Sequence, residues 1–551
     1  MKRKRILFLA LAAFITCGIG ALLTSCSDDD NNNSSSNNNK PAETDTYEIE
    51  VEAGMKMNEN QFQTKVPATT DCDQAVITAL QAIDKVTDVK AFKMSTFSYK
   101  INDRVTKTAY FFNYKQDIDH NNPSKGWFKQ QCVLTVAGKD RPTVLMTEGY
   151  ALGGAEPTLN LNRLDSLVET PLVETMNANC LQVEHRYFGW SLPEGWTNRW
   201  SYLSAKQQSD DLHAIVTAIK GSGIIGKSGK WLSVGSSKGG ETTAFYAYHY
   251  PNEVDAYVPF VAPFMFSTMD LRPFTYILED AHIGNNMQKV KAAFRAFFKN
   301  RELQEQAVEI LKKDKKWASQ HSVDDLRLAL MFSMYNNHFL KMSYVPYTKW
   351  LPLVPKEGDS AEKFYKYIMA DAATRYEGDS ETEYDTRVDG FNDFEGNNNP
   401  FGIDTLNYSV KARTRATTAT KVRFNPFMVQ SAKELGYALN DYSWIVDLVT
   451  PENLSALNKP DCDPRTYGVT HDGGAFIRQF LTGMKQSDCY MIFVYGEQDP
   501  WTGACIPNEY LGKNSQVLSI TDGIHNDFIY DWNETERNAL LNWLKAVGFD
   551  F

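Results

Sequence analysis

Residues 231–240 of this 551-residue chain read WLSVGSSKGG, and they carry the pattern that points most clearly to a fold class. It opens with an apolar run that is typical of a buried strand. The pattern Gly-x-Ser-x-Gly follows at 235–239, and a helical pattern then extends from about Gly240 to Tyr250. A serine at such a strand-to-helix turn has its hydroxyl at a helix N-terminus, where developing negative charge is favoured. We therefore interpret Ser237 as a nucleophile; the alternative is a Gly/Ser-rich turn without a chemical role.

Strands and helices alternate on both sides of this turn. A helix is expected from Ser204, whose spacing to Gln207 matches a capping box, to Gly221. This alternation is typical of a mostly parallel sheet with flanking helices, which is the core of an α/β hydrolase. The other short apolar runs that predict buried strands lie at 143–147, 180–185, 490–495 and 516–520.

The chain divides into five predicted segments. Aromatic and β-branched runs between about Phe92 and Val136 predict antiparallel strands at the start of the sheet. Strands become hard to find from about Met269 to Met484, where helical patterns dominate at 290–317 and 322–341. The segments are a leader (1–25), a disordered tether (26–45), the first part of the α/β core with its preceding antiparallel strands (46–268), a mostly helical cap insertion (269–484) and the second part of the core (485–551).

Ser237 needs a base and an acid, because a serine hydroxyl is a poor nucleophile at neutral pH. In an α/β-hydrolase core the partners follow in the order Ser, Asp, His. Asp499 lies in GEQDPW, directly after the predicted strand 490–495, and His525 lies in DGIH, directly after the next strand. Because active-site residues gather at the carboxyl ends of parallel strands, we expect a Ser237–Asp499–His525 triad that works through an acyl-enzyme.

Other side chains compete for the roles of base and acid. His471, in the insertion, is the best rival base, although only His525 follows a terminal strand. Asp522 and Asp527 are rival carboxylates, but they are too close to His525 in sequence to orient its ring in the usual way.

The negative oxygen of the reaction intermediate needs preorganised N–H donors. One is expected from the backbone of Lys238, the residue after the nucleophile. A second is expected from the loop that contains Gly149 and Tyr150, after the first parallel strand. The Lys238 side chain has two interpretations: a cation that stabilises charge beside the nucleophile, or a surface residue of the helix.

Residues 1–26 resemble the leader of an exported bacterial lipoprotein. A basic start precedes an apolar run from Ile6 to about Leu23, and Leu-Thr-Ser-Cys at 23–26 resembles a lipobox. This resemblance implies that Cys26 is acylated. It also implies export and anchoring to outer-membrane lipid, on the periplasmic or the cell-surface face. The alternative is an ordinary cleaved signal with an accidental cysteine. Residues 27–39 are almost entirely Asp, Asn and Ser, which favours a disordered tether.

Composition argues against nucleic acid as a partner and permits disulfides without defining them. The chain has a net charge of -11, and an acidic surface repels polyphosphates, so nucleic acid is not an expected partner. Six cysteines remain after Cys17 and Cys26, and an even number in an exported protein permits disulfides. The chain has no Cys-x-x-Cys or His-Glu-x-x-His pattern, and we expect neither a metal nor a cofactor. The sequence does not define the oligomeric state.

Motifs in the core resemble the secreted bacterial prolyl tri- and tetrapeptidyl aminopeptidases, and their relatives in the lysosomal prolyl carboxypeptidase and dipeptidyl peptidase family. The resemblance implies an α/β-hydrolase core with a helical cap, and a serine peptidase that cleaves near the N-terminus with a preference for proline. The relatives usually carry Gly-Gly-Ser-Tyr-Gly-Gly at the nucleophile; the GSSKGG found here favours the bacterial aminopeptidase branch. The motifs are TEG at 147–149, EHRYFG at 184–189, YLS at 202–204, the Ser237 turn, GEQDPW at 496–501 and His525.

An exopeptidase of this kind needs an acid that binds the free amine of the substrate. Glu148 and Glu184 are candidates by position. The alternative for each is a buried structural salt bridge, for example between Glu184 and Arg186. Trp501, beside the expected acid, is a candidate wall of a proline pocket, with core packing as its alternative.

Two other functions remain as alternatives. The same triad serves any acyl transfer, so an esterase, lipase or deacylase is possible on this fold. A surface lipoprotein that binds nutrient oligomers would explain the leader and the tether, but it has no use for three catalytic residues at strand ends. Peptide substrates are therefore the expected partners.

Overall fold

The structure is a computed structural model. It describes residues 49–50, 68–152, 167–193, 200–278, 286–369, 422–423, 426–457 and 462–551. The predicted leader, tether and acylated Cys26 lie outside these residues. Within the described ranges, no helix combines the length and apolarity needed to span a membrane.

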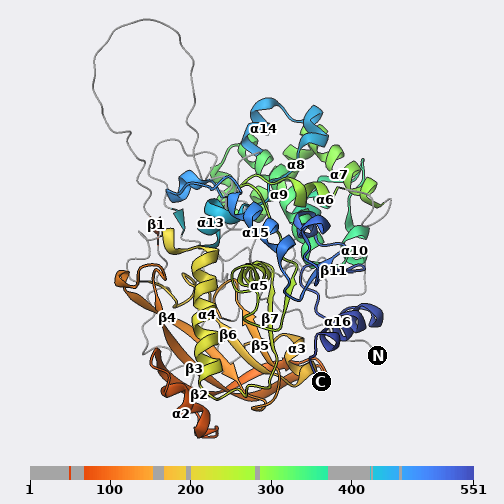
Figure 1. The fold of residues 1–551 in the computed structure, drawn as a ribbon. Coiled ribbons are helices and arrows are strands. Elements are labelled where there is room, and N and C mark those ends of the chain that lie inside the picture. Colours follow the sequence, from red (N-terminus) through yellow and green to blue (C-terminus); the bar gives the residue numbers. More distant parts are fainter. Residues whose placement is uncertain are drawn as a thin grey trace, which may run out of the picture.

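Nine strands form the central sheet (Figure 1). They are β2 (Val86–Ser98), β3 (Asp103–Asp117), β4 (Trp127–Thr135), β5 (Thr143–Thr147), β6 (Asn179–Val183), β7 (Trp231–Ser236), β8 (Ala256–Phe260), β10 (Met491–Gly496) and β11 (Ser515–Ile520). Their order is β11-β10-β8-β7-β5-β6-β4-β3-β2. Neighbours from β11 to β6 pair in parallel, and those from β6 to β2 pair antiparallel. The predicted α/β-hydrolase core, with antiparallel strands at its start, is confirmed.

Helices cover both faces of this sheet. Successive strand residues point to opposite faces, so Leu145 belongs to one apolar core and Val144 to the other. The core around Leu145 packs against α4 (Ala205–Gly221), α5 (Lys238–His249) and α15 (Ala475–Gln486). The core around Val144 packs against α3 (Pro171–Met176) and α16 (Glu534–Ala546). Thus α15, at the end of the insertion, packs on the sheet rather than within the cap.

Local signals placed α4 correctly. Ser204 is its N-cap and accepts a hydrogen bond from the backbone N–H of Gln207 at 3.3 Å. The helix ends at Gly221, as predicted. The strand β8 was not predicted. Its sequence contains Pro259, which lacks an N–H for the ladder and normally argues against a central strand.

The cap helices gather above the carboxyl ends of the strands and share one large apolar core (Figure 1). The helix predicted at 290–317 is two helices, because the backbone of Asn300 is extended and its side chain accepts from the N–H of Leu303 at 3.0 Å. The helices are α6 (Arg272–Tyr276), α7 (Met287–Lys299), α8 (Arg301–Asp314), α9 (Val323–Tyr344), α10 (Tyr347–Trp350), α11 (Ala361–Met369), α13 (Pro426–Gln430) and α14 (Pro451–Leu457).

Three smaller features complete the description. A short helix, α2 (Gln74–Gln81), packs against β2, and β1 (Ile49–Glu50) pairs with β9 (Val422–Arg423) away from the main sheet. The disulfides that the cysteine count permits are not formed by Cys72, Cys132, Cys180, Cys489 or Cys505.

Candidate active site

Ser237 lies in the turn between β7 and α5. Its backbone has φ 57° and ψ -124°, a conformation that a residue with a side chain rarely adopts. The N–H of Ser237 donates to the carbonyl oxygen of Phe260 at 2.9 Å, which ties the turn to the end of β8. The strained turn places the Ser237 side chain at the N-terminus of α5, as the sequence pattern predicts.

Three glycines allow this turn to pack against the end of β5. A Cβ on Gly235 would lie 2.1 Å from the carbonyl oxygen of Gly239, and a Cβ on Gly239 would lie 2.6 Å from the carbonyl oxygen of Thr147. A Cβ on Gly149 would lie 2.5 Å from the backbone nitrogen of Gly239. The hydroxyl of Thr147 donates to the carbonyl oxygen of Gly239 at 2.9 Å. The nucleophile turn and the loop after β5 are therefore in direct backbone contact.

Asp499 and His525 form a buried pair after β10 and β11. Nδ1 of His525 donates to Oδ2 of Asp499 at 2.7 Å. Asp499 is 0% exposed and His525 is 2% exposed. The other Asp499 oxygen accepts the N–H of Trp501 at 3.1 Å, which holds the carboxylate in place. This arrangement leaves Nε2 of His525 as the nitrogen that can take a proton.

The two rival acids and the rival base each have a hydrogen-bond partner other than the proposed triad residues. Asp522 accepts from the side chain of Gln498 at 2.7 Å. Asp527 accepts from the N–H of Ile524 at 3.0 Å. Nδ1 of His471 accepts from a neighbouring backbone N–H at 3.0 Å. Of the candidates, the structure brings together Asp499 and His525.

The Tyr150 phenol and the Ser237 hydroxyl are neighbours, and the hydroxyl acts to lower the pKa of Tyr150. No hydrogen bond joins Ser237 to His525, both of which the structure describes. In enzymes without bound substrate, catalytic hydrogen bonds are often long or poorly aligned and tighten when the substrate binds. Burial raises the pKa of Tyr150 well above its usual range, so its phenol keeps its proton.

Two backbone N–H groups are available beside Ser237. In the described part of the chain, the N–H groups of Lys238 and Gly149 donate to no acceptor. Lys238 is the first residue of α5, where N–H groups lack partners within the helix. Gly149 and Tyr150 follow β5, where the second donor was expected. Paired N–H groups of this kind stabilise an oxyanion.

Glu184 has a structural role in place of the amine-binding role considered from sequence. Its buried carboxylate accepts from the N–H groups of Leu152 (3.0 Å), Trp190 (3.1 Å) and Ser191 (3.0 Å), and from the Ser191 hydroxyl (2.7 Å). These hydrogen bonds occupy both carboxylate oxygens of Glu184 and hold in place the loop at Leu152 and the loop at Trp190 and Ser191. The alternative role, a salt bridge between Glu184 and Arg186, is not observed either.

Arg186 is paired with Asp211 instead. Its Nε donates to Oδ2 at 2.7 Å and its Nη2 to Oδ1 at 2.6 Å, and both side chains are fully buried. This two-pronged pair joins the segment after β6 to α4.

Glu148 differs from Glu184 because its carboxyl group has no hydrogen-bond partner among the described residues. Burial raises the pKa of Glu148 to about 8, and the nearby charge of Glu184 adds to this effect. A cation that approached Glu148 would stabilise its ionised form. Glu148 therefore remains a candidate for binding an amine.

The cap reaches the Asp499–His525 pair through Trp501. The Trp501 ring lies 6.2 Å from the His525 ring, 5.1 Å from Phe339 in α9 and 5.9 Å from Tyr437. Only 7% of Trp501 is exposed. The Trp501 ring packs in the cap core and also lies beside His525. Its position is therefore compatible with core packing and with a wall of a proline pocket.

The end of α9 also contacts His525. The carbonyl oxygen of Ser343 accepts the backbone N–H of His525 at 2.8 Å. The Tyr344 ring lies 5.7 Å from the His525 ring at an angle of 87°. Sequence analysis missed these cap residues because no motif marks a backbone carbonyl or a ring contact.

Comparisons with known proteins identify a similar family and a similar relative. The family model for PS-10 peptidase S37 matches residues 82–291, which include Ser237. The prolyl tri/tetrapeptidyl aminopeptidase of Streptomyces mobaraensis is 25% identical over 404 residues, covering 71% of this chain and 69% of that protein.

Similar solved structures include the alpha/beta hydrolase GrgF from Penicillium sp. sh18, with 12% identity, a TM-score of 0.33 and coverage of 80% of this chain and 98% of that one. A proline iminopeptidase from Mycobacterium smegmatis has 10% identity, a TM-score of 0.32 and coverage of 76% and 95%.

The packing at Gly239 generates a prediction. We expect Gly239→Ala to lower kcat/KM by at least about 100-fold, because the added Cβ would push the turn away from Thr147 and displace the N–H donors. Gly221→Ala is the control, since a Cβ there meets no atom within 4 Å. It should keep the wild-type rate of peptide hydrolysis. Wild-type kcat/KM in a folded Gly239→Ala variant would contradict the role given to this contact.

Proposed function

We propose that the chain is a serine peptidase of the S37 type, which the match to that family model supports, and that it releases short N-terminal peptides through an acyl-enzyme on Ser237. The observation that carries the proposal is the hydrogen bond of 2.7 Å between His525 and Asp499, which follow parallel strands of the same sheet as Ser237. The preference for proline at the cleaved bond rests on the family resemblance and on the name of the Streptomyces relative.

The residues divide the chemistry as follows. His525 takes the Ser237 proton as the hydroxyl attacks the substrate carbonyl. The N–H groups of Lys238 and Gly149 stabilise the resulting oxyanion, and His525 then protonates the leaving amine. Water hydrolyses the acyl-enzyme by the same steps in reverse order. Asp499 keeps the His525 ring in the required tautomer and stabilises its cation.

Glu148 is the group proposed to bind the free amine of the substrate. It is a half-buried carboxyl beside the donor loop that has no hydrogen-bond partner in the described ranges, whereas the Glu184 carboxylate accepts several hydrogen bonds. An ammonium group would supply the missing partner and favour the charged carboxylate.

Trp501 is proposed to form one wall of the proline pocket. Its ring faces His525 and continues into the rings of Tyr437 and Phe427, which lie 5.8 Å apart, and on to Tyr150, 5.9 Å from Phe427. A series of aromatic rings offers the apolar surface that a proline ring can pack against.

Export and anchoring through an acylated Cys26 are also proposed. The basic start, the apolar run and the lipobox-like Leu-Thr-Ser-Cys support this location, on the periplasmic or cell-surface face of the outer membrane.

A direct test uses the protein without its leader, residues 27–551, as wild type and as Ser237→Ala. Both are incubated with unlabelled peptides that carry proline at varied positions, and mass spectrometry identifies the products. We expect short N-terminal fragments from the wild type alone. Equal cleavage by Ser237→Ala would refute the nucleophile. Hydrolysis of p-nitrophenyl esters without any peptide cleavage would favour the esterase alternative.

Substitution of Glu148 tests the amine site. We expect Glu148→Gln to raise KM for peptides with a free N-terminus by about 10- to 100-fold, with a smaller effect on kcat, because a buried charge pair with the substrate is lost. N-acetylated versions of the same peptides are the control. They should be poor substrates of the wild type and change little in the variant. An equal loss on free and acetylated peptides would assign Glu148 a structural role.

A further inference from the structure

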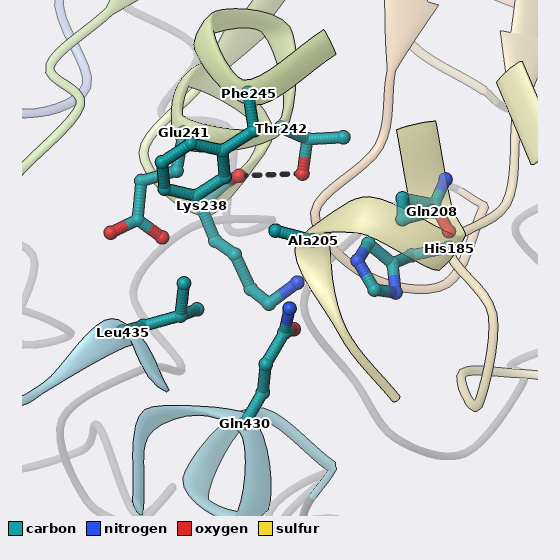
Figure 2. Close-up of a pocket in the computed structure, with 9 residues that line it drawn as sticks. All are labelled: His185, Ala205, Gln208, Lys238, Glu241, Thr242, Phe245, Gln430 and Leu435. Carbon is teal, nitrogen blue, oxygen red and sulfur yellow. Dashed lines mark hydrogen bonds between the residues drawn. The ribbon is translucent and has the colours of Figure 1, made fainter. Parts of the chain in front are cut away.

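The Lys238 side chain is buried in a small cavity between α5 and the cap (Figure 2). Only 2% of the residue is exposed, which excludes the surface interpretation. The cavity offers about 10 Å³ to the centre of a water molecule, enough for one water. Gln430, at the end of α13, and Leu435, at the end of the π-helical turn Ser431–Leu435, close it from the cap side. The cap therefore shields the charge of Lys238 from bulk solvent.

The Lys238 ammonium group faces two aromatic rings. Its nitrogen lies 5.3 Å from the centre of the Phe188 ring and 5.7 Å from the centre of the Tyr150 ring. Such rings attract a cation, most strongly where water is excluded. Tyr150 is in turn a neighbour of Ser237, whose hydroxyl acts on the pKa of the phenol. Lys238 is thus linked to the nucleophile through its own backbone and through Tyr150.

The cavity wall has more hydrogen-bonding capacity than the protein uses. Oε2 of Glu241, Nε2 of Gln208 and Oε1 of Gln430 are buried without a hydrogen-bond partner. A buried polar atom without a partner is costly, so polar groups gathered around one cavity indicate that the cavity has a role in placing Lys238.

Ionisable groups approach Lys238 from three elements. Glu241 lies on α5 itself, His185 follows β6, and Glu434 lies on the π-helical turn of the cap. Burial lowers the pKa of Lys238 to about 7, although Glu241 and Glu434 act to raise it. Burial raises the pKa of Glu241 to about 8. Since Lys238 and Glu241 titrate as a pair, the pair loses positive charge as the pH rises through neutrality.

The other groups near the cavity keep their charge state or have their own partners. Burial lowers the pKa of His185 well below its usual value, and the charge of Lys238 adds to this, so the ring stays neutral. Burial raises the pKa of Glu434, whose carboxyl accepts from Gln430 and from the N–H of Ala205. Lys433 donates to backbone carbonyls, and Arg186 is paired with Asp211.

We propose that the buried Lys238 side chain is a positioning residue of the oxyanion hole, whose charge stabilises the negative oxygen formed during attack by Ser237. The side chain acts without touching the substrate. It belongs to the residue whose N–H is an oxyanion donor, and it lies at the N-terminus of α5, whose dipole acts in the same direction. Charges in a space from which water is excluded interact far more strongly than in solvent. This inference rests on the serine peptidase function proposed above.

The test is the pH dependence of kcat of the wild type and of Lys238→Met, at saturating concentrations of a peptide that the wild type cleaves, where the bound amine already keeps Glu148 ionised. A lysine with a lowered pKa is charged below about pH 7 and loses its charge above it, so the wild type should lose activity as the pH rises through neutrality. We expect Lys238→Met to lack this descending limb. Below pH 7 its kcat should be about 10- to 100-fold lower.

Two further variants keep the test sharp. Lys238→Arg should retain activity and lose the descending limb, because a guanidinium group stays charged. Lys220→Met, on α4, removes another lysine whose pKa burial lowers, and should leave the profile unchanged. Thermal unfolding confirms that each variant is folded.

The outcomes separate this inference from the function on which it rests. A wild type that cleaves no peptide refutes the peptidase proposal. If the wild type is active and Lys238→Met has the same activity below pH 7, or keeps the same descending limb, the role of the Lys238 charge is refuted. The peptidase proposal then still stands.

Discussion

The close backbone contact between the nucleophile turn and the end of β5 is the constraint on which the site depends. Gly239 approaches Thr147 so closely that any side chain would collide with the strand. This contact keeps Ser237 in a conformation that is costly in isolation, and it brings the N–H groups of Lys238 and Gly149 to the same place. Because the N–H groups are held by packing, they need not reorganise when negative charge develops between them.

The polar residues around this contact divide into scaffold and chemistry. Glu184 and Arg186 lie in one motif, and each saturates its hydrogen bonds within the protein. They order the loops that surround the site. Lys238 is buried and Glu148 is half-buried without a hydrogen-bond partner among the described residues, and the pKa values of both are shifted toward neutrality. Perturbed groups of this kind cluster at functional sites, although structural ion pairs also occur there.

Sequence reasoning worked where the signal is local. The strand before Ser237, the cap at Ser204 and the acid and base after β10 and β11 each follow from a few neighbouring residues, and the structure contains the strands, the cap and the Asp499–His525 pair. The strand β8 was missed because Pro259 contradicts the usual pattern. The break at Asn300 was missed because apolar periodicity continues across it.

Long-range contacts were beyond the reach of the sequence. No pattern predicts that the Ser343 carbonyl holds His525, since any residue supplies a carbonyl group. The burial of Lys238 depends on where the cap places Gln430 and Leu435, nearly two hundred positions later in the chain. The same limit explains why Glu148 and Glu184 looked alike in sequence: only the fold shows which carboxyl group already has its partners.

Mapping the adduct of a fluorophosphonate inhibitor would show whether Ser237 is the activated nucleophile. Such inhibitors react with a serine only when a base activates it and an oxyanion site receives the new charge. Mass analysis of the digested protein should find one adduct, on Ser237, and Asp499→Asn should slow its formation by about 1,000-fold or more, since His525 would lose its required tautomer. An adduct on Ser236 or another residue, or an unchanged rate in Asp499→Asn, would contradict the account.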